Sequence, residues 1–97
     1  MKQKLRVLVA EGNSREATSA LLVLFSKERD GLELTEVSGV STLMASLEVV
    51  RPEVILLELA LAEPHPLYVV RRLHRAEPTV PLIVIGDAAQ RKALAPG

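Results

Sequence analysis

The sequence predicts an α/β protein built on an open parallel sheet with helices on both faces. Four short apolar stretches of strand length alternate with segments in which apolar residues recur at helical spacing. Each connection is long enough for the crossover that parallel strands require, and right-handed crossovers place helices on both faces of the sheet. Since the chain has 97 residues, we expect one domain spanning 1–97.

The strands are expected where apolar residues run together. The stretches 5–10 and 54–57 run with little interruption, as parallel strands buried on both faces do. Residues 32–37 alternate at first, which indicates a strand with one wetter face. The fourth stretch, 82–85, breaks at Gly86-Asp87. The third stretch is the most apolar and ends at Glu58, so we place it at the centre of the sheet.

Four helices are expected in the segments that follow these strands. The first starts at Asn13 or Ser14 and ends at Asp30-Gly31, and the second is capped by Ser41 and ends at Arg51-Pro52. A loop at 59–66 precedes the third helix, 67–75, and a short fourth helix covers 88–94. The expected inward residues are Leu43, Met44, Leu47 and Val50 in the second helix and Leu67, Val70 and Leu73 in the third, whereas Arg71, Arg72 and Arg75 face outward.

The composition excludes several classes of function. The formal net charge is zero, so no overall field attracts the chain to nucleic acid or to an anionic membrane. The absence of cysteine excludes disulfides, thiolate metal sites and thiol catalysis. No segment reaches the roughly 18 consecutive apolar residues of a membrane span. The basic start resembles the first part of a signal peptide, but Glu11 interrupts the apolar run behind it, so we expect a cytoplasmic domain.

The residues at the strand ends are similar to a known pattern. In an open parallel sheet, functional residues gather outside the carboxyl ends of the strands. The segments Val7-Leu8-Val9-Ala10-Glu11-Gly12-Asn13, Arg51-Pro52-Glu53-Val54-Ile55-Leu56-Leu57-Glu58-Leu59 and Pro81-Leu82-Ile83-Val84-Ile85 resemble three stretches of the receiver domain of bacterial response regulators. Their spacing matches without gaps from Leu5 to Asp87. The resemblance implies a sheet of the flavodoxin-like type with strand order 2-1-3-4, the fifth strand of receivers being outside this chain.

The resemblance also assigns positions to the functional residues. Glu58 falls on the phosphorylated aspartate, Glu11 on the first residue of the receiver acidic pair, and Gly12 on the second, which binds Mg²⁺ directly. Gly86 falls on the Thr or Ser that contacts the phosphoryl group, with Asp87 after it. Ala62 and Pro66 fall on the usual Pro and Gly of the loop behind the acceptor. The lysine that pairs with the acceptor belongs to the fifth strand.

These departures indicate a domain that does not transfer phosphate. Gly12 supplies no carboxylate, and Glu58 moves its carboxylate outward by one methylene, about 1.5 Å, whereas Mg²⁺ needs nearly ideal octahedral geometry. No hydroxyl or ammonium group at the expected positions stabilises the phosphoryl charge. We therefore expect no enzyme activity, no cofactor and no Mg²⁺. Glu11, Glu58 and Asp87 remain weak candidates for a cation site; the alternative is three solvated carboxylates, or one with a raised pKa.

Glu58 itself has two interpretations. Its longer side chain can imitate a phosphorylated acceptor and lock an active-like surface, or it can be a tolerated acid at a strand end. We favour the second, because Gly86 removes the partner through which the imitation would act. His65 in its loop and His74 on the basic helix face are interpreted as solvated side chains rather than ligands. Nucleotide-binding glycine motifs and the serine-hydrolase elbow are missing from the sequence.

The function we expect is that of a receiver-like signalling module that acts through protein–protein contacts independently of phosphorylation. The partner would be a sensor kinase, an output domain or a second copy. We interpret the chain as a fragment, and we expect the apolar edge at 82–85 to be covered in a dimer, because exposed strand edges invite pairing. The alternatives are a working phosphoacceptor with atypical acids and a flavodoxin-like domain that binds a small ligand.

Overall fold

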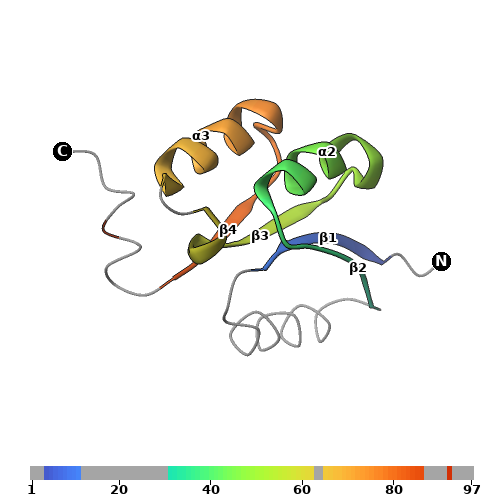
Figure 1. Cartoon of the computed structure of the whole chain (residues 1–97). Helices are drawn as coiled ribbons and strands as arrows, with labels where there is room; N and C mark the ends of the chain where they lie inside the picture. Colours follow the sequence, from blue (N-terminus) through green and yellow to red (C-terminus); the bar gives the residue numbers. More distant parts are fainter. Residues whose placement is uncertain (1–3, 12–30, 63–64, 87–91, 93–97) are drawn as a thin grey trace.

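Within the residues that the structure describes, the protein is a four-stranded parallel sheet, and helices α2 and α3 cover one of its faces (Figure 1). The structure is a computed structural model, and it describes residues 4–11, 31–62, 65–86 and 92. In chain order the elements are β1 (Leu5–Ala10), β2 (Leu32–Val37), α2 (Val40–Val50), β3 (Val54–Glu58), the 3-10 helix η1 (Leu59–Ala62), α3 (Pro66–Ala76) and β4 (Leu82–Ile85). The helix predicted from Asn13 or Ser14 and, apart from Lys92, the one predicted at 88–94 lie outside the described residues.

The strand order is β2-β1-β3-β4, and every neighbouring pair is parallel. In register, β1 pairs Leu8 with Ile55 of β3, and β3 pairs Leu56 with Ile83 of β4. This arrangement confirms the predicted fold class and the predicted order, and it is consistent with an open flavodoxin-like sheet. It also brings the carboxyl ends of the strands to the same edge of the sheet.

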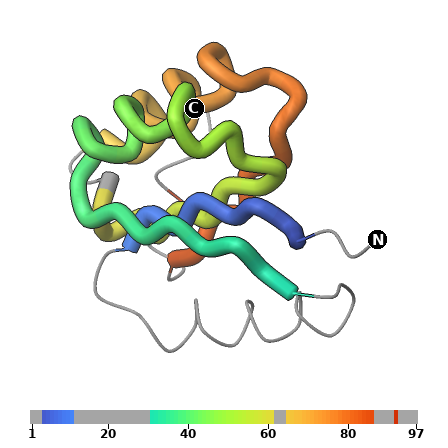
Figure 2. The backbone as a smooth tube through the Cα atoms, turned by 90° about the vertical axis from the view of Figure 1, so that its right-hand side faces the viewer, coloured from blue at the N-terminus to red at the C-terminus, as the bar shows by residue number. Residues whose placement is uncertain are grey.

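The two faces of the sheet carry separate apolar clusters, because successive strand residues point to opposite faces. α2 and α3 lie side by side over one face (Figures 1 and 2), where they contribute Leu43, Leu47, Val69 and Leu73 to a buried cluster. The strands contribute Leu8, Ala10, Val37, Ile55 and Leu57 to the same cluster. The other face carries a second buried cluster of Val7, Val9, Val54 and Leu56. β3 and the part of β1 from Val7 to Ala10 are therefore buried on both faces, as their apolar runs predict.

The start of α2 differs from the prediction. Gly39, not Ser41, is the N-cap residue, and it has an extended backbone with φ −148° and no side-chain capping bond. The Leu43 N–H donates to the Gly39 carbonyl at 2.9 Å, so the first helical bond already spans Ser41. The break at Gly39 leads straight into the helix, and Ser41 becomes an exposed residue of its first turn.

The inward face of α3 is also turned relative to the prediction. Pro66 occupies the first turn and is buried together with Val69 and Leu73, whereas Leu67 and Val70 are only half-buried. Proline suits this position because the first helical N–H groups lack intrahelical partners. Its burial sets the phase of the helix, which the periodicity of the aliphatic residues alone does not reveal. The predicted outward position of Arg71, Arg72 and Arg75 is confirmed.

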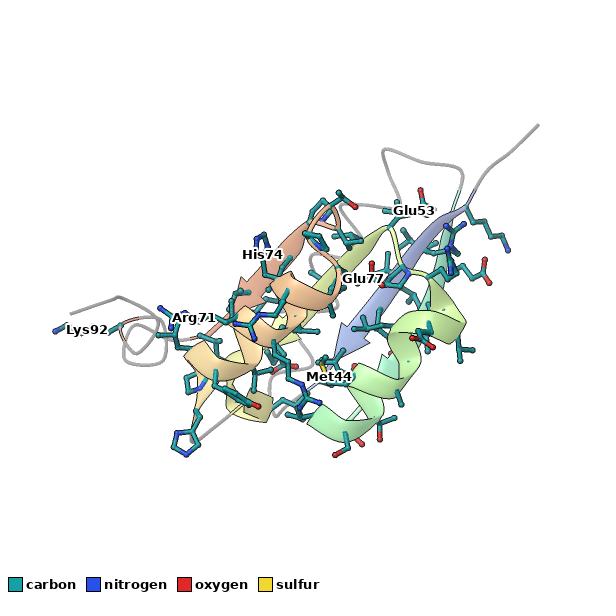
Figure 3. The ribbon with its side chains drawn as sticks, turned by 90° about the horizontal axis from the view of Figure 1, so that it is seen from above. Met44, Glu53, Arg71, His74, Glu77 and Lys92 are labelled. Carbon is teal, nitrogen blue, oxygen red and sulfur yellow. The ribbon has the colours of Figure 1, made fainter. Side chains whose placement is uncertain are left out.

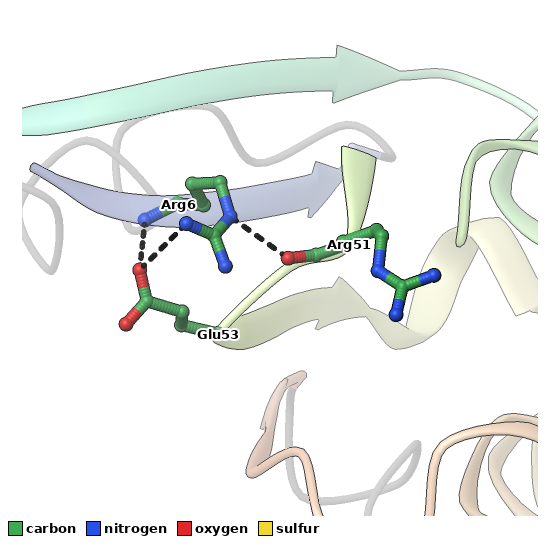
Figure 4. Close-up of polar contacts among 3 residues, drawn as sticks. All are labelled: Arg6, Arg51 and Glu53. Carbon is green, nitrogen blue, oxygen red and sulfur yellow. Dashed lines mark hydrogen bonds and ion pairs between the residues drawn. The ribbon is translucent and has the colours of Figure 1, made fainter. Parts of the chain in front are cut away.

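A polar cluster at the amino ends of β1 and β3 connects the α2–β3 turn to the sheet (Figure 4). The Arg6 backbone N–H donates to Glu53 Oε1 at 3.2 Å, and Arg6 Nε donates to the Arg51 carbonyl at 2.9 Å. An ion pair joins Arg6 Nη1 to Glu53 Oε1 at 3.6 Å. Arg51 has φ 51° and ψ 62°, a left-handed conformation that is uncommon for a residue with a Cβ atom.

None of the helices within the described residues combines the length and the apolar character needed to cross a membrane.

Candidate functional site

The candidate site lies at the edge of the sheet where the parallel strands end. Two of the predicted acidic residues, Glu11 and Glu58, follow or close the neighbouring strands β1 and β3. The β1–β3 register runs to the pair Ala10 and Leu57. Continued by one residue, it places Glu11 beside Glu58, and neighbouring strands are about 4.8 Å apart. The structure therefore brings the two predicted acids to one edge and into adjacent strands.

Glu58 is the one buried charged or polar residue among the described residues, with 3% of its surface exposed. Successive side chains of β3 point to opposite faces of the sheet, so Glu58 lies on the same face as Val54 and Leu56. Ile55 and Leu57 lie on the other face, which α2 and α3 cover. A buried carboxylate without a partner would be costly, by several kcal/mol in order of magnitude. Glu58 does engage in a polar interaction within the chain, and no buried side-chain oxygen or nitrogen in the described part lacks a partner.

Glu11 is held at the end of β1 by the sheet itself. Its backbone N–H donates to the Val37 carbonyl at 2.9 Å, which extends the β1–β2 ladder by one residue. Glu11 is half-buried and has a further interaction within the chain. By strand alternation Glu11 belongs to the same face as Val7 and Val9, which is also the face of Glu58. The two carboxylates thus share one face as well as one edge.

The end of β4 contributes no polar side chain at the position next to Glu58. Ile85 of β4 is the register partner of Glu58, and Gly86 follows it as a half-buried residue without a side chain. Gly86, where the resemblance to receivers predicts a hydroxyl side chain, thus follows directly after the register partner of Glu58. Gly12 and Asp87, the remaining predicted site positions, lie outside the described residues.

The segment behind Glu58 is more regular than predicted. The loop expected at 59–66 begins with the 3-10 helix η1, which ends at Ala62. Pro66, the other loop position assigned by resemblance, is the buried first residue of α3. Leu59 is fully buried directly after Glu58. Leu57, Glu58 and Leu59 are thus buried in succession at the end of β3.

The described residues contain no group of three or more His, Cys, Asp or Glu side chains arranged to hold a metal ion. Of the three carboxylates in the predicted weak cation site, Glu11 and Glu58 belong to the described residues and Asp87 lies outside them. His65 is the exposed N-cap residue of α3 and His74 is exposed on the same helix, in agreement with their interpretation as solvated side chains.

The contact between Arg6 and Glu53 was not predicted from the sequence. The pairing register brings the start of β1 against the turn before β3, and the Glu53 N–H donates to the Arg6 carbonyl at 2.8 Å. The sequence does show a basic residue near the start of the first strand, Arg6, and an acid directly before the third, Glu53. The cluster lies at the amino ends of the strands, so it stabilises the fold and takes no part in the acidic edge.

Chemically, this edge offers a buried carboxylate, a half-buried one beside it and a backbone position without a side chain. Such an arrangement favours cations or hydrogen-bond donors and repels phosphate. A scan of the sequence against protein-family models finds no match, and a search among curated proteins finds none either.

Proposed function

We propose that this chain is a receiver-like interaction module of bacterial two-component signalling that works without phosphorylation and is not an enzyme. The observation that carries the proposal is Glu58, a carboxylate 3% exposed at the end of the central strand and beside Glu11 in register. The strand order β2-β1-β3-β4 and the receiver-like segments around both acids support the same assignment.

The chemistry of the edge argues against phosphotransfer. A phosphodonor carries negative charge and must approach the acceptor carboxylate closely. Two adjacent carboxylates repel it unless a divalent cation neutralises them, and that cation prefers several well-placed oxygen ligands. Gly86 supplies no hydroxyl to bind the transferred group. In this proposal Glu58 has the position of a phosphoacceptor, and the described residues beside it offer no hydroxyl or ammonium group to stabilise the transition state.

The module would act through its surfaces, and the β4 edge is one of them. Leu82 to Ile85 are all half-buried, and among the described strands β4 pairs only with β3. Ile55 N–H donates to the Pro81 carbonyl at 3.0 Å, so the backbone groups of Leu82 and Val84 point away from β3. Outward N–H and C=O groups on an apolar strand favour strand pairing, and we propose a second copy or an output domain as the partner there.

The deciding experiment is incubation of the protein with acetyl phosphate and Mg²⁺, followed by intact-mass measurement. We expect no adduct. The matched control is Glu58→Gln, which keeps the size of the side chain and removes the nucleophilic carboxylate. An adduct of one phosphoryl group that appears in the natural chain and disappears in Glu58→Gln would establish a working phosphoacceptor instead. An adduct common to both proteins would lie elsewhere and leave the proposal intact.

The alternative of a ligand-binding flavodoxin-like domain is tested separately. A thermal-shift screen with flavin mononucleotide and nucleoside phosphates should leave the melting temperature of the natural chain unchanged. A saturable rise in melting temperature with one of these compounds would favour that alternative, because a ligand that binds only the folded state stabilises it.

A further inference from the structure

Helix α3 concentrates positive charge in a chain whose formal net charge is zero. It contains three arginines, Arg71, Arg72 and Arg75, and no acidic residue. The first acid after it, Glu77, is the half-buried C-cap residue, and its backbone N–H donates to the Leu73 carbonyl at 2.9 Å. The neutral total therefore conceals a region of a single sign on α3.

One side of α3 carries an aromatic residue and all three arginines of the helix. These four residues have the spacing i, i+3, i+4 and i+7, so they lie on the same side of the helix. We call them the α3 stripe: Tyr68, Arg71, Arg72 and Arg75. Val69 and Leu73, which are buried in the cluster beneath α3, lie on the opposite side. At 1.5 Å of rise per residue, the stripe is about 10 Å long.

All four residues of the α3 stripe are available at the surface. The three arginines are exposed, and Tyr68 is 64% exposed. Among the described residues, no hydrogen bond or ion pair engages the side chain of Arg71, Arg72 or Arg75. Figure 3 shows Arg71 extending from α3 on the side away from α2. The three guanidinium groups therefore keep their donors for a partner.

An acidic protein segment fits the chemistry of the α3 stripe. A guanidinium group presents paired N–H donors whose geometry matches a carboxylate, and clusters of arginines recognise acidic segments in this way. Arginine and tyrosine are also enriched among the residues that contribute most to binding at protein interfaces. A partner helix with carboxylates four residues apart presents them at the same spacing as Arg71 and Arg75.

Nucleic acid and lipid surfaces fit the α3 stripe less well. Proteins that bind DNA through its backbone neutralise several phosphates, on the order of 6–10, whereas the stripe offers three cations. A helix that binds in a membrane surface buries its apolar face in the lipid, whereas the apolar face of α3 is buried against the sheet. A second copy that presented the same stripe would oppose like charges. The stripe therefore favours a different, acidic protein.

We propose that the α3 stripe is a docking surface for an acidic amphipathic helix of a partner protein. Arg71 and Arg75 bind two carboxylates of the partner, and Tyr68 packs against an apolar side chain beside them. Because these charged groups are exposed, each pair is weak and is screened by salt. The inference names a partner for the proposed interaction module but uses neither Glu58 nor the β4 edge, so the acetyl phosphate experiment and the experiment below can fail independently.

The test is a fluorescence anisotropy titration with a labelled synthetic helix that carries glutamates four residues apart and leucines between them. The natural chain should bind this peptide saturably in 50 mM NaCl, with a dissociation constant below about 1 mM. A peptide with glutamine in place of every glutamate should bind at least about tenfold more weakly. Raising the salt to 500 mM NaCl should weaken binding of the glutamate peptide by a similar factor.

Substitutions identify the surface. R71E/R75E should weaken binding of the glutamate peptide by at least about tenfold, and Y68A by about fivefold. K4E/R51E is the matched control, because it reverses two exposed basic residues outside α3 and changes the net charge by the same amount. It should bind within about threefold of the natural chain. Circular dichroism verifies that each variant is folded.

Four results would overturn the proposal. The natural chain could fail to bind the glutamate peptide at up to about 1 mM protein. K4E/R51E could lose as much binding as R71E/R75E, in which case the overall charge attracts the peptide. A DNA duplex or phosphatidylserine vesicles could bind the natural chain more tightly than the peptide does and lose that binding in R71E/R75E. Sedimentation velocity could show self-association of the natural chain that R71E/R75E abolishes, which would make a second copy the occupant.

Discussion

Replacement of Arg51 by glycine should stabilise the protein. Arg51 has φ 51° and ψ 62°, where a Cβ atom costs about 1–2 kcal/mol relative to glycine. Glycine also loses more backbone freedom on folding than other residues do, and this entropy cost reduces the gain in stability by about 0.5–1 kcal/mol. Both hydrogen bonds at this position use the Arg51 backbone, its N–H to the Leu47 carbonyl and its carbonyl from Arg6 Nε, so they survive the substitution. We expect a net gain of about 0.5–1 kcal/mol in the free energy of unfolding.

Urea denaturation followed by circular dichroism at 222 nm measures this gain, with thermal melting as a second assay. For a domain of this size, the expected gain corresponds to a rise in melting temperature of roughly 2–8 °C. Arg51→Ala is the matched control, because it removes the same guanidinium group but keeps the Cβ atom. It should be close to the natural chain. A glycine variant no more stable than the alanine variant would refute the claim that the left-handed backbone is strained here.

The remaining predictions concern the glycines, the ion pair and the core, and urea denaturation measures each of them. Gly31→Ala should destabilise the protein by about 1–3 kcal/mol, because Gly31 has φ +149°, which a residue with a Cβ atom rarely adopts. Gly39→Ser should stabilise it by a few tenths of a kcal/mol, because serine can cap α2 from this extended N-cap position. Equal effects of the two substitutions would contradict the claim that the backbone conformation at Gly31 requires glycine. Glu53→Gln should change stability by less than about 1 kcal/mol, because Arg6 and Glu53 are 45% and 36% exposed and the amide oxygen can still accept from the Arg6 N–H; a larger loss would show that the ion pair matters more. Leu73→Ala should cost about 2–5 kcal/mol, and Val49→Ala, at a position 85% exposed, should cost almost nothing.

Several features of the fold were predictable because they depend on local pattern. The strand runs at Leu5–Ala10 and Leu82–Ile85 agree residue for residue with the predicted ranges. A short apolar run between polar residues indicates a strand of the same length, because a parallel strand is buried on both faces and needs apolar side chains on each. The helix limits were less predictable. Gly39 rather than Ser41 begins α2, and Pro66 sets the phase of α3, because packing against the sheet decides which residue of several candidates starts a helix.

The candidate site divides in the same way. The sequence indicated that Glu11 and Glu58 end apolar strands, and parallel pairing makes it likewise predictable that such residues share an edge. The burial of Glu58 to 3% exposure was not predictable, because it depends on the residues that other elements place around it. The Arg6 and Glu53 contact was also missed, since 47 residues separate the pair along the chain.

The sequence by itself determined the fold class, the number of these strands and the outward position of the α3 arginines, because each follows from the local alternation of apolar and polar residues. The strand order followed from the resemblance to receivers, and the structure confirms it. Only the tertiary structure decided the register that sets Glu11 beside Glu58, the burial of Glu58 and the left-handed backbone at Arg51. These features depend on which segments pack against each other. The free energy that favours one packing over another comes from apolar surface buried over the whole domain.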